Sequence, residues 1–313
     1  VLVQGEERSE MSTVTISNTV QVKPKRELPW RRRGEAGFDK PTLPSFVGRY
    51  VLLIFCLIIT IGPFIWELST SLKGQGEDIY SFPPNLIPQQ PTLDNYAEVL
   101  RTIPVINYAW HSLAVGIATV ITNVIFATFA GYAFAQMKFK GKGICMAIVL
   151  STLLLPGEVT LTSQYLTIKS LGLANSLAGV FLPGAISAMN VLLMYTAARA
   201  IPNSILDAAA IDGATTYQRL RHIVWPNVKG MASVVALMSF IGAWDDFLWP
   251  LVVLNDPAKY TLTVGMQYLQ SSFGANQRVV AAGTMIALIP LIILFACAQK
   301  FFFKGVEAGG VKG

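Results

Sequence analysis

The sequence has few charged residues for its length. Of its 313 residues, 13% are charged and 53% are hydrophobic, and the mean hydropathy is +0.51. A soluble domain carries about 25% charged residues, so this chain has too little charge to cover a globular surface. We therefore expect an all-α polytopic membrane protein, because helices satisfy their own backbone hydrogen bonds inside a bilayer.

The sequence also lacks the residue patterns of metal sites and of nucleophilic catalysis. Its three cysteines, Cys56, Cys145 and Cys297, lie far apart inside apolar runs and give neither a disulfide framework nor metal-ligand spacing. Its two histidines, His111 and His222, have no second ligand type nearby. The phosphate-binding pattern G-x-x-x-x-G-K-[ST] is missing. We expect no enzyme activity, no metal and no cofactor in this chain.

Six apolar segments are long enough to cross a bilayer, which takes about 20 residues of α-helix. They are expected to form one membrane region over residues 46–304, between a polar N-terminal tail (1–45) and a C-terminal tail (305–313). The connection at 73–106 is rich in proline at first and then predicts a short surface helix. The predicted spans are residues 46–68, 107–136, 143–167, 175–198, 230–254 and 279–300.

The lysines and arginines indicate how the spans are oriented. Of the 24 basic residues, 19 fall in the two tails, the 138–142 turn and the 199–229 loop, and five fall in the connections on the other side. Basic residues favour the cytoplasmic side of a membrane. Both termini and the 199–229 loop are therefore expected to face the cytoplasm of a prokaryote, and the net charge of +6 needs no nucleic acid to explain it.

The N-terminal tail contains four prolines and the basic cluster Arg31–Arg33, so we expect it to be disordered. Its arginines can attract anionic lipid headgroups or act only as a topology determinant. The tail has no apolar core of the kind that a cleavable signal peptide needs.

The loop after the fourth span begins with signals for a short helix. Pro202 marks the start of this helix, and Asp207 is expected in its first turn, where a negative charge complements the helix dipole. A narrow face of mostly small side chains follows at spacings of three and four, formed by Leu206, Ala209, Ala210 and Gly213.

A second short helix is expected after Gly213, because glycine permits a reversal of the chain. Thr215 or Thr216 can cap this helix, and Pro226 is expected to end it before the chain re-enters the membrane. A helix-turn-helix of this kind can lie on the lipid surface or dock on a cytoplasmic partner, and its amphipathic pattern favours neither.

The residue order of this loop favours the partner. It reads DAAAIDGA over 207–214, then eight residues, then IVWP over 223–226. This closely resembles the EAA signature of ABC-importer permeases, E-A-A-x-x-D-G-A, eight residues and I-x-L-P. Asp207 stands where glutamate is usual and Trp225 where leucine is usual, but the spacing is intact.

The resemblance extends from about residue 46 to the end of the chain. The six spans, the WDDFLWP motif at 244–250 and the terminal AGGVKG at 308–313 resemble the carbohydrate-uptake permeases related to the MalG subunit of the maltose importer. That family implies the type I importer fold, also called MetI-like, and half of a translocation pathway for a sugar. It also implies a second permease subunit, two ATPase subunits that bind ATP and Mg, and an extracytoplasmic solute-binding protein as partners.

The resemblance further implies two contacts with the ATPase. The coupling residues would be Asp207, Ala208, Ala209, Asp212, Gly213, Ala214, Ile223 and Pro226. The C-terminal tail would contact the ATPase dimer through Gly309, Gly310, Val311, Lys312 and Gly313.

Acidic residues inside the spans are candidates for the solute pathway, because a charge within a bilayer is costly. Carboxylates accept hydrogen bonds from sugar hydroxyls, and indole faces stack on sugar rings. Alternatively, the acids reach the outer headgroups and the tryptophans belong to an interfacial aromatic belt. The candidates are Glu158, Trp244, Asp245, Asp246 and Trp249.

The sequence also contains signals for helix packing and bending, and it leaves other functions open. Gly131 with Ala127 and Ala135 predicts close helix packing, and Pro183 predicts a kink. The same machinery could import glycerol-3-phosphate or glycerophosphodiesters. An ion-coupled secondary transporter would use the intramembrane acids as ion sites but leaves the 207–226 pattern unexplained, and a membrane-embedded enzyme lacks a catalytic constellation.

Overall fold

The computed structural model describes residues 43–83, 85–274 and 276–310. Within these residues the secondary structure is helical apart from one isolated bridge between Lys73 and Pro91. The chain divides into two compact units, Val1–Ile59 and Thr60–Gly313. Helix α1 (Leu43–Leu72) begins in the first unit and ends in the second.

The second unit contains a series of helices of very different lengths. In chain order they are α2 (Asp94–Thr102), α3 (Val105–Gln136), α4 (Lys142–Thr152), α5 (Gly157–Ser170), α6 (Leu177–Phe181), the 3-10 turn η2 (Leu182–Gly184), α7 (Ala188–Arg199), α8 (Asn203–Ile211), α9 (Thr216–Arg219), the π-helical turn η3 (Leu220–Val224), α10 (Trp225–Asp245), α11 (Leu248–Val253), the 3-10 turn η4 (Pro257–Lys259), α12 (Leu262–Phe273) and α13 (Gln277–Gly310).

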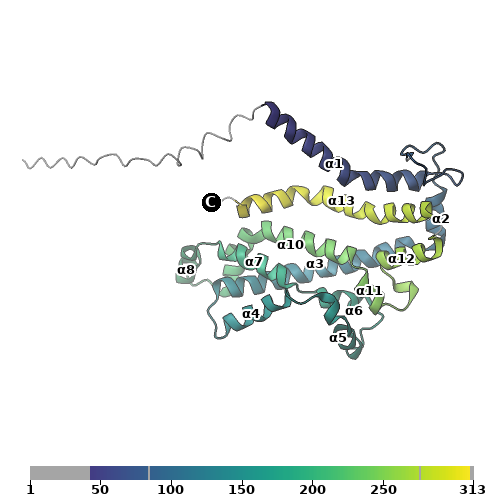
Figure 1. Cartoon of the computed structure of the whole chain (residues 1–313). Helices are drawn as coiled ribbons and strands as arrows, with labels where there is room; N and C mark the ends of the chain where they lie inside the picture. The colour runs from purple at the N-terminus through teal and green to yellow at the C-terminus, as the bar shows by residue number, and fades with distance from the viewer. Residues whose placement is uncertain (1–42, 84, 275, 311–313) are drawn as a thin grey trace, which may run out of the picture. The chain divides into compact units, whose positions relative to one another are not determined.

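Helix α3 is the centre of this unit. It packs against α7 and α10, and α10 packs in turn against α13 (Figure 1). The contact with α7 is very close at Gly131, where an added Cβ would lie 2.7 Å from backbone atoms of Met194 and Tyr195. Ala127, one turn earlier, is completely buried. The close packing predicted from the small-residue stripe is confirmed, because only a glycine lets the two backbones approach this far.

Among the described residues, four helices are long and apolar enough to cross a membrane. They cover Val47–Leu72, Val105–Gln136, Thr216–Asp245 and Gln277–Ala296. Two bent pairs of helices pass the same test only when each pair is counted as one span. These pairs are α4 with α5, and α6 and η2 with α7. The described residues thus supply four candidate spans, or six if each bent pair crosses once.

The two bent pairs fall in the spans predicted at 143–167 and 175–198. Helices α4 and α5 meet at an angle of 105°, and the break ends at Pro156. Proline has no N–H to donate and disfavours helical backbone in the residue before it, so the chain turns there. The second pair bends by 46° after the turn that contains Pro183, which confirms the predicted kink.

The observed helices differ from the fifth predicted span, 230–254, at both ends. Helix α10 ends at Asp245, because Asp246 adopts an extended backbone and its carboxylate accepts the N–H of Trp249 at 3.3 Å. Such local side-chain bonds compete with helix continuation. At the other end, the prediction that Pro226 ends a helix is wrong, because α9, η3 and α10 follow one another without a gap. The wider π-turn directly before Pro226 accommodates a residue that cannot make the usual i−4 bond.

The connection between α1 and α2 is held by a carboxylate. Glu77 accepts the backbone N–H of Gln90 at 2.7 Å and that of Gln89 at 3.0 Å, and these bonds lower the pKa of Glu77. Asn95 of α2 donates to the carbonyl oxygens of Ser71 and Lys73, each at 2.9 Å. The short helix predicted within 73–106 is therefore present and tied to the end of α1.

Candidate functional site

The loop between α7 and α10 folds as a helical hairpin. Gly213 joins its two arms with a φ of +80°, so the predicted reversal at this glycine is confirmed. Thr215 caps α9, and its hydroxyl accepts the N–H of Gln218 while the Gln218 side chain accepts the N–H of Thr215. Glycine is favoured at Gly213 because a Cβ strains a left-handed backbone.

One detail of the predicted hairpin is wrong. Helix α8 begins at Asn203, directly after Pro202, and no acidic residue lies in its first turn. Asp207 is the fifth residue of the helix and therefore lies one turn further along than predicted. Pro202 has extended backbone (ψ of 131°) and a proline φ that suits a helix boundary, so the helix starts immediately after it.

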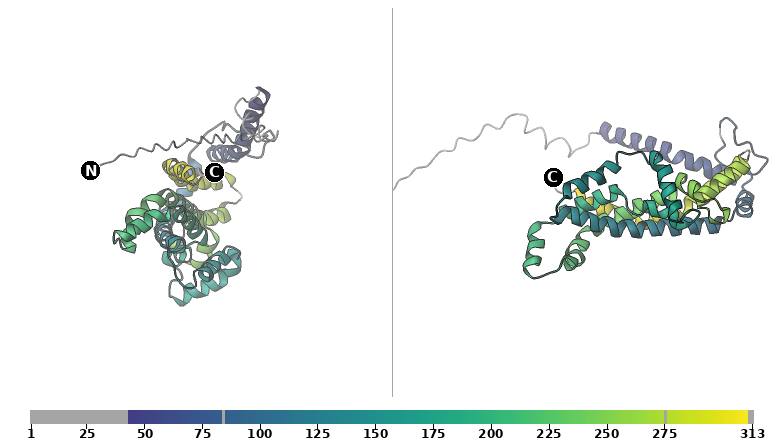
Figure 2. Two further views of the ribbon diagram at one scale, coloured as in Figure 1. Left: turned by 90° about the vertical axis from the view of Figure 1, so that its left-hand side faces the viewer. Right: turned by 90° about the horizontal axis from the view of Figure 1, so that it is seen from below.

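The tip of this hairpin is exposed. Asp207, Ala208, Asp212 and Gly213 are all exposed, and the side chain of Ile211 is 87% exposed. Figure 2 shows the hairpin projecting from the helical bundle at the end where α3 finishes. The tip therefore presents an apolar side chain among small residues at the protein surface.

The base of the hairpin is buried in the bundle. Leu206 of α8 and Val224 of η3 belong to one apolar cluster with Met194 of α7 and Val228 of α10. Leu206 is 5% exposed and Val224 is completely buried. A movement of α8 would thus act directly on side chains of two bundle helices.

The structure brings several residues of the predicted coupling motif into one surface hollow. This hollow has a volume of about 330 Å³ and lies beside the turn of the hairpin, along α9 and η3. Pro226 lies outside it, on the exposed side of α10, and Ala208 and Ala209 lie on α8. The hollow is lined by Asp212, Gly213, Ala214, Gln218, Arg219, His222 and Ile223.

The predicted C-terminal contact is described only in part. Helix α13 continues as far as Gly310, so Gly309 and Gly310 are helical. Val311, Lys312 and Gly313 lie outside the described residues.

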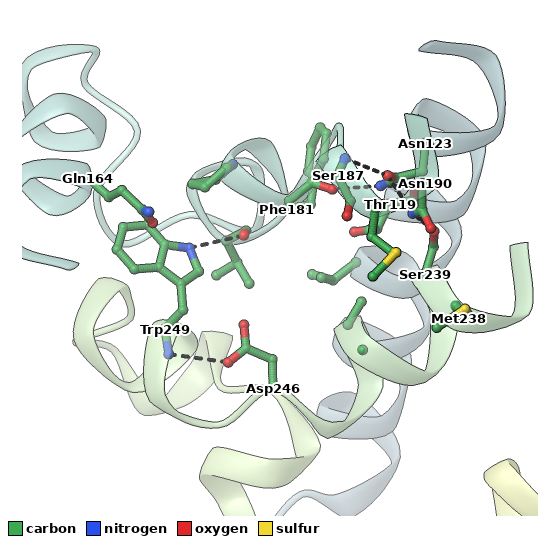
Figure 3. A pocket seen from close by; sticks show the side chains of 17 residues that line it. Thr119, Asn123, Gln164, Phe181, Ser187, Asn190, Met238, Ser239, Asp246 and Trp249 are labelled. Atoms are coloured by element: carbon green, nitrogen blue, oxygen red, sulfur yellow. Dashed lines mark hydrogen bonds between the residues drawn. The ribbon is translucent and has the colours of Figure 1, made fainter. Parts of the chain in front are cut away.

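A larger cavity lies inside the bundle, with a volume of about 420 Å³. It opens between α3, α5, α6, α7, α10 and α11, and Figure 3 shows its polar side chains facing one another across the open space. The polar residues that line it are Thr119, Asn123, Gln164, Ser187, Asn190, Ser239 and Asp246, and the aromatic ones are Phe181 and Trp249.

One wall of this cavity is a closed hydrogen-bond cluster. The side-chain oxygen of Asn123 accepts the N–H of Ser187 and the amide of Asn190, both at 2.9 Å. The Asn123 amide donates to the Gly184 carbonyl at 2.6 Å. Asn190 also donates to the hydroxyl of Ser239 at 3.0 Å. This cluster, which we call the Asn123 cluster, joins α3, α7 and α10 and is almost fully buried.

The opposite wall is formed by Asp246 and Trp249. The indole N–H of Trp249 donates to the carbonyl oxygens of Gly179 and Val180 at 3.2 and 3.1 Å, which holds α11 against α6. The backbone N–H of Trp249 donates to Asp246 Oδ1 (Figure 3). The break after α10 therefore directs a carboxylate into the cavity.

The other three residues predicted for the solute pathway lie elsewhere. Trp244 is 4% exposed and stacks on Phe240 with ring centroids 5.6 Å apart, so it packs in the apolar core. Asp245 is exposed at the end of α10, and Glu158 is exposed in the first turn of α5. Neither carboxylate lines the cavity.

The sequence reasoning did not identify the Asn123 cluster. Asn123 and Asn190 lie within predicted apolar spans, and a polar amide at such a depth is a signal that was available. Asn123, Asn190 and Ser239 lie far apart in the chain. The sequence does not indicate how α3, α7 and α10 are aligned with one another, so it could not predict that these side chains meet.

The described residues contain no group of three or more His, Cys, Asp or Glu side chains that could hold a metal ion. The cavity offers hydrogen-bond acceptors, amides and aromatic faces instead. This lining suits a polar, uncharged organic solute that contacts the side chains directly.

Replacing Asn123 by leucine is expected to destabilise the bundle by roughly 2 kcal/mol, because Gly184, Ser187 and Asn190 lose their hydrogen bonds to its side chain. Thr122→Val is the matched control in the same helix, since the Thr122 hydroxyl bonds only to carbonyls of α3 itself among the described residues. Thermal unfolding of the purified protein in detergent measures both changes. Equal melting temperatures for the two variants would contradict a structural role for the cluster.

Comparison with known proteins gives a consistent family assignment. Residues 88–308 match the family described as "Binding-protein-dependent transport system inner membrane component". The chain is 30% identical over 276 residues to the arabinooligosaccharides transport system permease protein AraQ of Bacillus subtilis, covering 86% of this chain and 98% of that protein. It is 32% identical to the galactooligosaccharides transport system permease protein GanQ of the same organism, covering 84% and 94%.

A solved structure shares the fold. It is a chain of a bacterial ABC transporter involved in the import of the acidic polysaccharide alginate, with a TM-score of 0.72 and 24% sequence identity. The similarity covers 82% of this chain and 95% of that one.

Proposed function

Because this chain belongs to the family of binding-protein-dependent transport system inner membrane components, and specifically resembles its carbohydrate-uptake permeases, we propose that it forms half of the translocation pathway of an ATP-driven sugar importer. As a member of this family the chain is a multi-pass membrane protein and a transporter subunit. The proposal concerns its solute, its partners and the roles of its residues.

The coupling role is best supported by the burial of the α8 hairpin, which is exposed at its tip and buried at its base. Its tip, from Asp207 to Gly213, is exposed, while Leu206 at its base is buried in the core of the bundle. A surface element that is free at the tip and packed at the base can transmit the movement of a docked partner to α7 and α10. We assign the docking to Asp207, Ala208, Ala209, Asp212, Gly213, Ala214, Ile223 and Pro226.

The partner at this hairpin is proposed to be an ATPase. The 313 residues contain no phosphate-binding loop, so the energy for uphill transport must come from another subunit. Two ATPase subunits would bind ATP and Mg, and their closure would move the hairpin of each permease subunit. Alternating access would then follow from the rocking of the bundles around the solute pathway. Residues 309–313 are proposed as a second contact with the ATPase dimer.

The solute is proposed to be a sugar. The relatives named above transport arabinooligosaccharides and galactooligosaccharides, according to their names. The cavity beside the Asn123 cluster combines amides, hydroxyls, one carboxylate and the rings of Phe181 and Trp249. Such groups bond to hydroxyls and stack on the apolar faces of sugar rings. These observations disfavour glycerol-3-phosphate and its diesters as the solute.

Six membrane crossings with both termini in the cytoplasm complete the proposal. Four long helices and two bent pairs among the described residues provide enough apolar helix for six crossings. The excess of basic residues in the tails and in the 138–142 and 199–229 segments supports this orientation. It would place the α8 hairpin on the ATPase side and the connection at 73–93 on the side of a solute-binding protein.

Uptake by proteoliposomes tests the proposal. The complete complex would contain this chain, its second permease subunit, the ATPase dimer and the solute-binding protein. We expect uptake of a labelled neutral oligosaccharide only when ATP is enclosed with the ATPase and the binding protein is present outside. Uptake driven by a proton or sodium gradient without ATP would contradict the proposal and support an ion-coupled transporter.

A further inference from the structure

The cavity that contains the Asn123 cluster has a single charged side chain. Its lining residues include one carboxylate, Asp246, and no lysine, arginine or histidine. The amides of Asn123 and Asn190 are already committed to bonds within the cluster. An anionic solute in this cavity would therefore meet a negative charge and no cation to balance it.

The position of Asp246 is set by two hydrogen bonds, one to its side chain and one to its backbone. One carboxylate oxygen accepts the backbone N–H of Trp249 at 3.3 Å, and the backbone carbonyl of Asp246 accepts the hydroxyl of Thr263 from α12 at 2.8 Å. Trp249 is itself anchored to the carbonyls of α6. In Figure 3 the second carboxylate oxygen points away from Trp249 into the cavity. A carboxylate bonded to an anchored residue is directed toward a solute in the cavity.

A carboxylate in such a position distinguishes solutes by charge. Its free oxygen accepts a hydrogen bond from a sugar hydroxyl, and charge-assisted bonds of this kind are stronger than neutral ones. A carboxylate, sulfonate or phosphate on the solute would instead be repelled, because it carries the same charge as the Asp246 carboxylate.

We propose that Asp246 is a specificity-determining residue, which makes this cavity a subsite for neutral hydroxylated solutes and excludes anionic ones. The inference rests on the proposed function, because it assumes that the cavity belongs to the pathway of a sugar importer. It goes further in assigning a charge class of solute and one residue that sets it.

Direct binding to the purified transporter tests this assignment without the selectivity of the binding protein. The probes are arabinotriose and the same trisaccharide oxidised at its reducing end to a carboxylate. Saturation-transfer NMR on the detergent-solubilised complex would compare them. We expect the wild type to bind the neutral trisaccharide at least about tenfold more tightly than the acid, because like charges oppose binding of the acid.

The variant Asp246→Asn should reduce this preference by changing the binding of both trisaccharides. Binding of the neutral trisaccharide should weaken by about tenfold, because a charge-assisted bond is lost, and binding of the acid should strengthen. The matched control is Asp245→Asn, which removes the adjacent, exposed carboxylate that does not line the cavity and should leave the preference unchanged. Asp246→Glu keeps the charge and should still exclude the acid, which keeps the test valid if Asp246→Asn fails to fold.

The assignment is overturned if the wild type binds both trisaccharides equally, or if Asp246→Asn and Asp245→Asn have the same preference. Such a result leaves the proposed function intact as long as the wild-type complex imports neutral oligosaccharide with ATP. Conversely, a wild-type complex that imports no sugar with ATP contradicts the proposed function, whatever the binding preference of the cavity.

Discussion

Replacing Gly213 by tryptophan is expected to reduce ATP-driven uptake by about a hundredfold or more, which is the effect of losing a central contact in a protein interface. Gly213 is exposed at the tip of the α8 hairpin, and no atom lies within 4 Å of a Cβ built on it. The new side chain would therefore start from an open position on the surface of the hairpin. It would occupy the surface on which the proposed ATPase docks.

A second left-handed glycine provides a close control for this prediction. Gly172 has a φ of +71°, is exposed and also has no atom within 4 Å of a built Cβ, but it lies between α5 and α6. Gly172→Trp introduces the same backbone strain and the same side chain away from the hairpin. Copurification of the ATPase and uptake by proteoliposomes should be lost for Gly213→Trp and retained for Gly172→Trp.

The comparison separates docking from folding. If both variants lose uptake equally, strain at a left-handed glycine is the cause and the hairpin has no special role. If Gly213→Trp retains a bound ATPase and full uptake, the coupling role of this loop is wrong. Gly213→Ala would then be expected to cost only about 1 kcal/mol of local strain, without an effect on transport.

Gly131→Ala is expected to destabilise the bundle by about 3 kcal/mol, at the upper end of the cost of overpacking. The added methyl would lie 2.7 Å from the backbone of Met194 and Tyr195, and backbone atoms cannot rotate out of the way as a side chain can. Helices α3 and α7 must therefore separate along their contact. The melting temperature in detergent and the yield of folded protein in the membrane measure the effect.

Gly62→Ala is the corresponding control for Gly131→Ala. Gly62 also lies inside a long helix, α1, but nothing lies within 4 Å of its built Cβ. The substitution should leave stability unchanged or raise it slightly, because alanine has the better helix propensity. A wild-type melting temperature for Gly131→Ala would show that α3 and α7 do not pack as closely as described.

Local chemistry determines much of the α8 hairpin. The sequence was sufficient to predict the reversal at Gly213 and a hydroxyl cap at Thr215 or Thr216, and the structure has the cap at Thr215. The end predicted at Pro226 failed because a π-turn, which has no clear sequence signal, allows the helix to continue through the proline.

The extents of the long spans were predictable for the same local reason, and so was the kink at Pro183, but the angles of the bends were not. Length and hydropathy are properties of a segment, and they identified α1, α3 and α13 closely. The angle of 105° between α4 and α5 depends on what each helix packs against.

The sequence by itself determined the class and the family of this protein and indicated the hairpin that we propose as its coupling loop, because apolar length, charge distribution and the spacing of residues 207–226 are properties of single segments. Only the tertiary structure decided which polar groups share the cavity. Asp246 enters it while its neighbour Asp245 does not, and Trp249 lines it while Trp244 is buried in the core. Adjacent residues are separated in this way because the helix ends between them, and that break depends on contacts made by α6, α11 and α12.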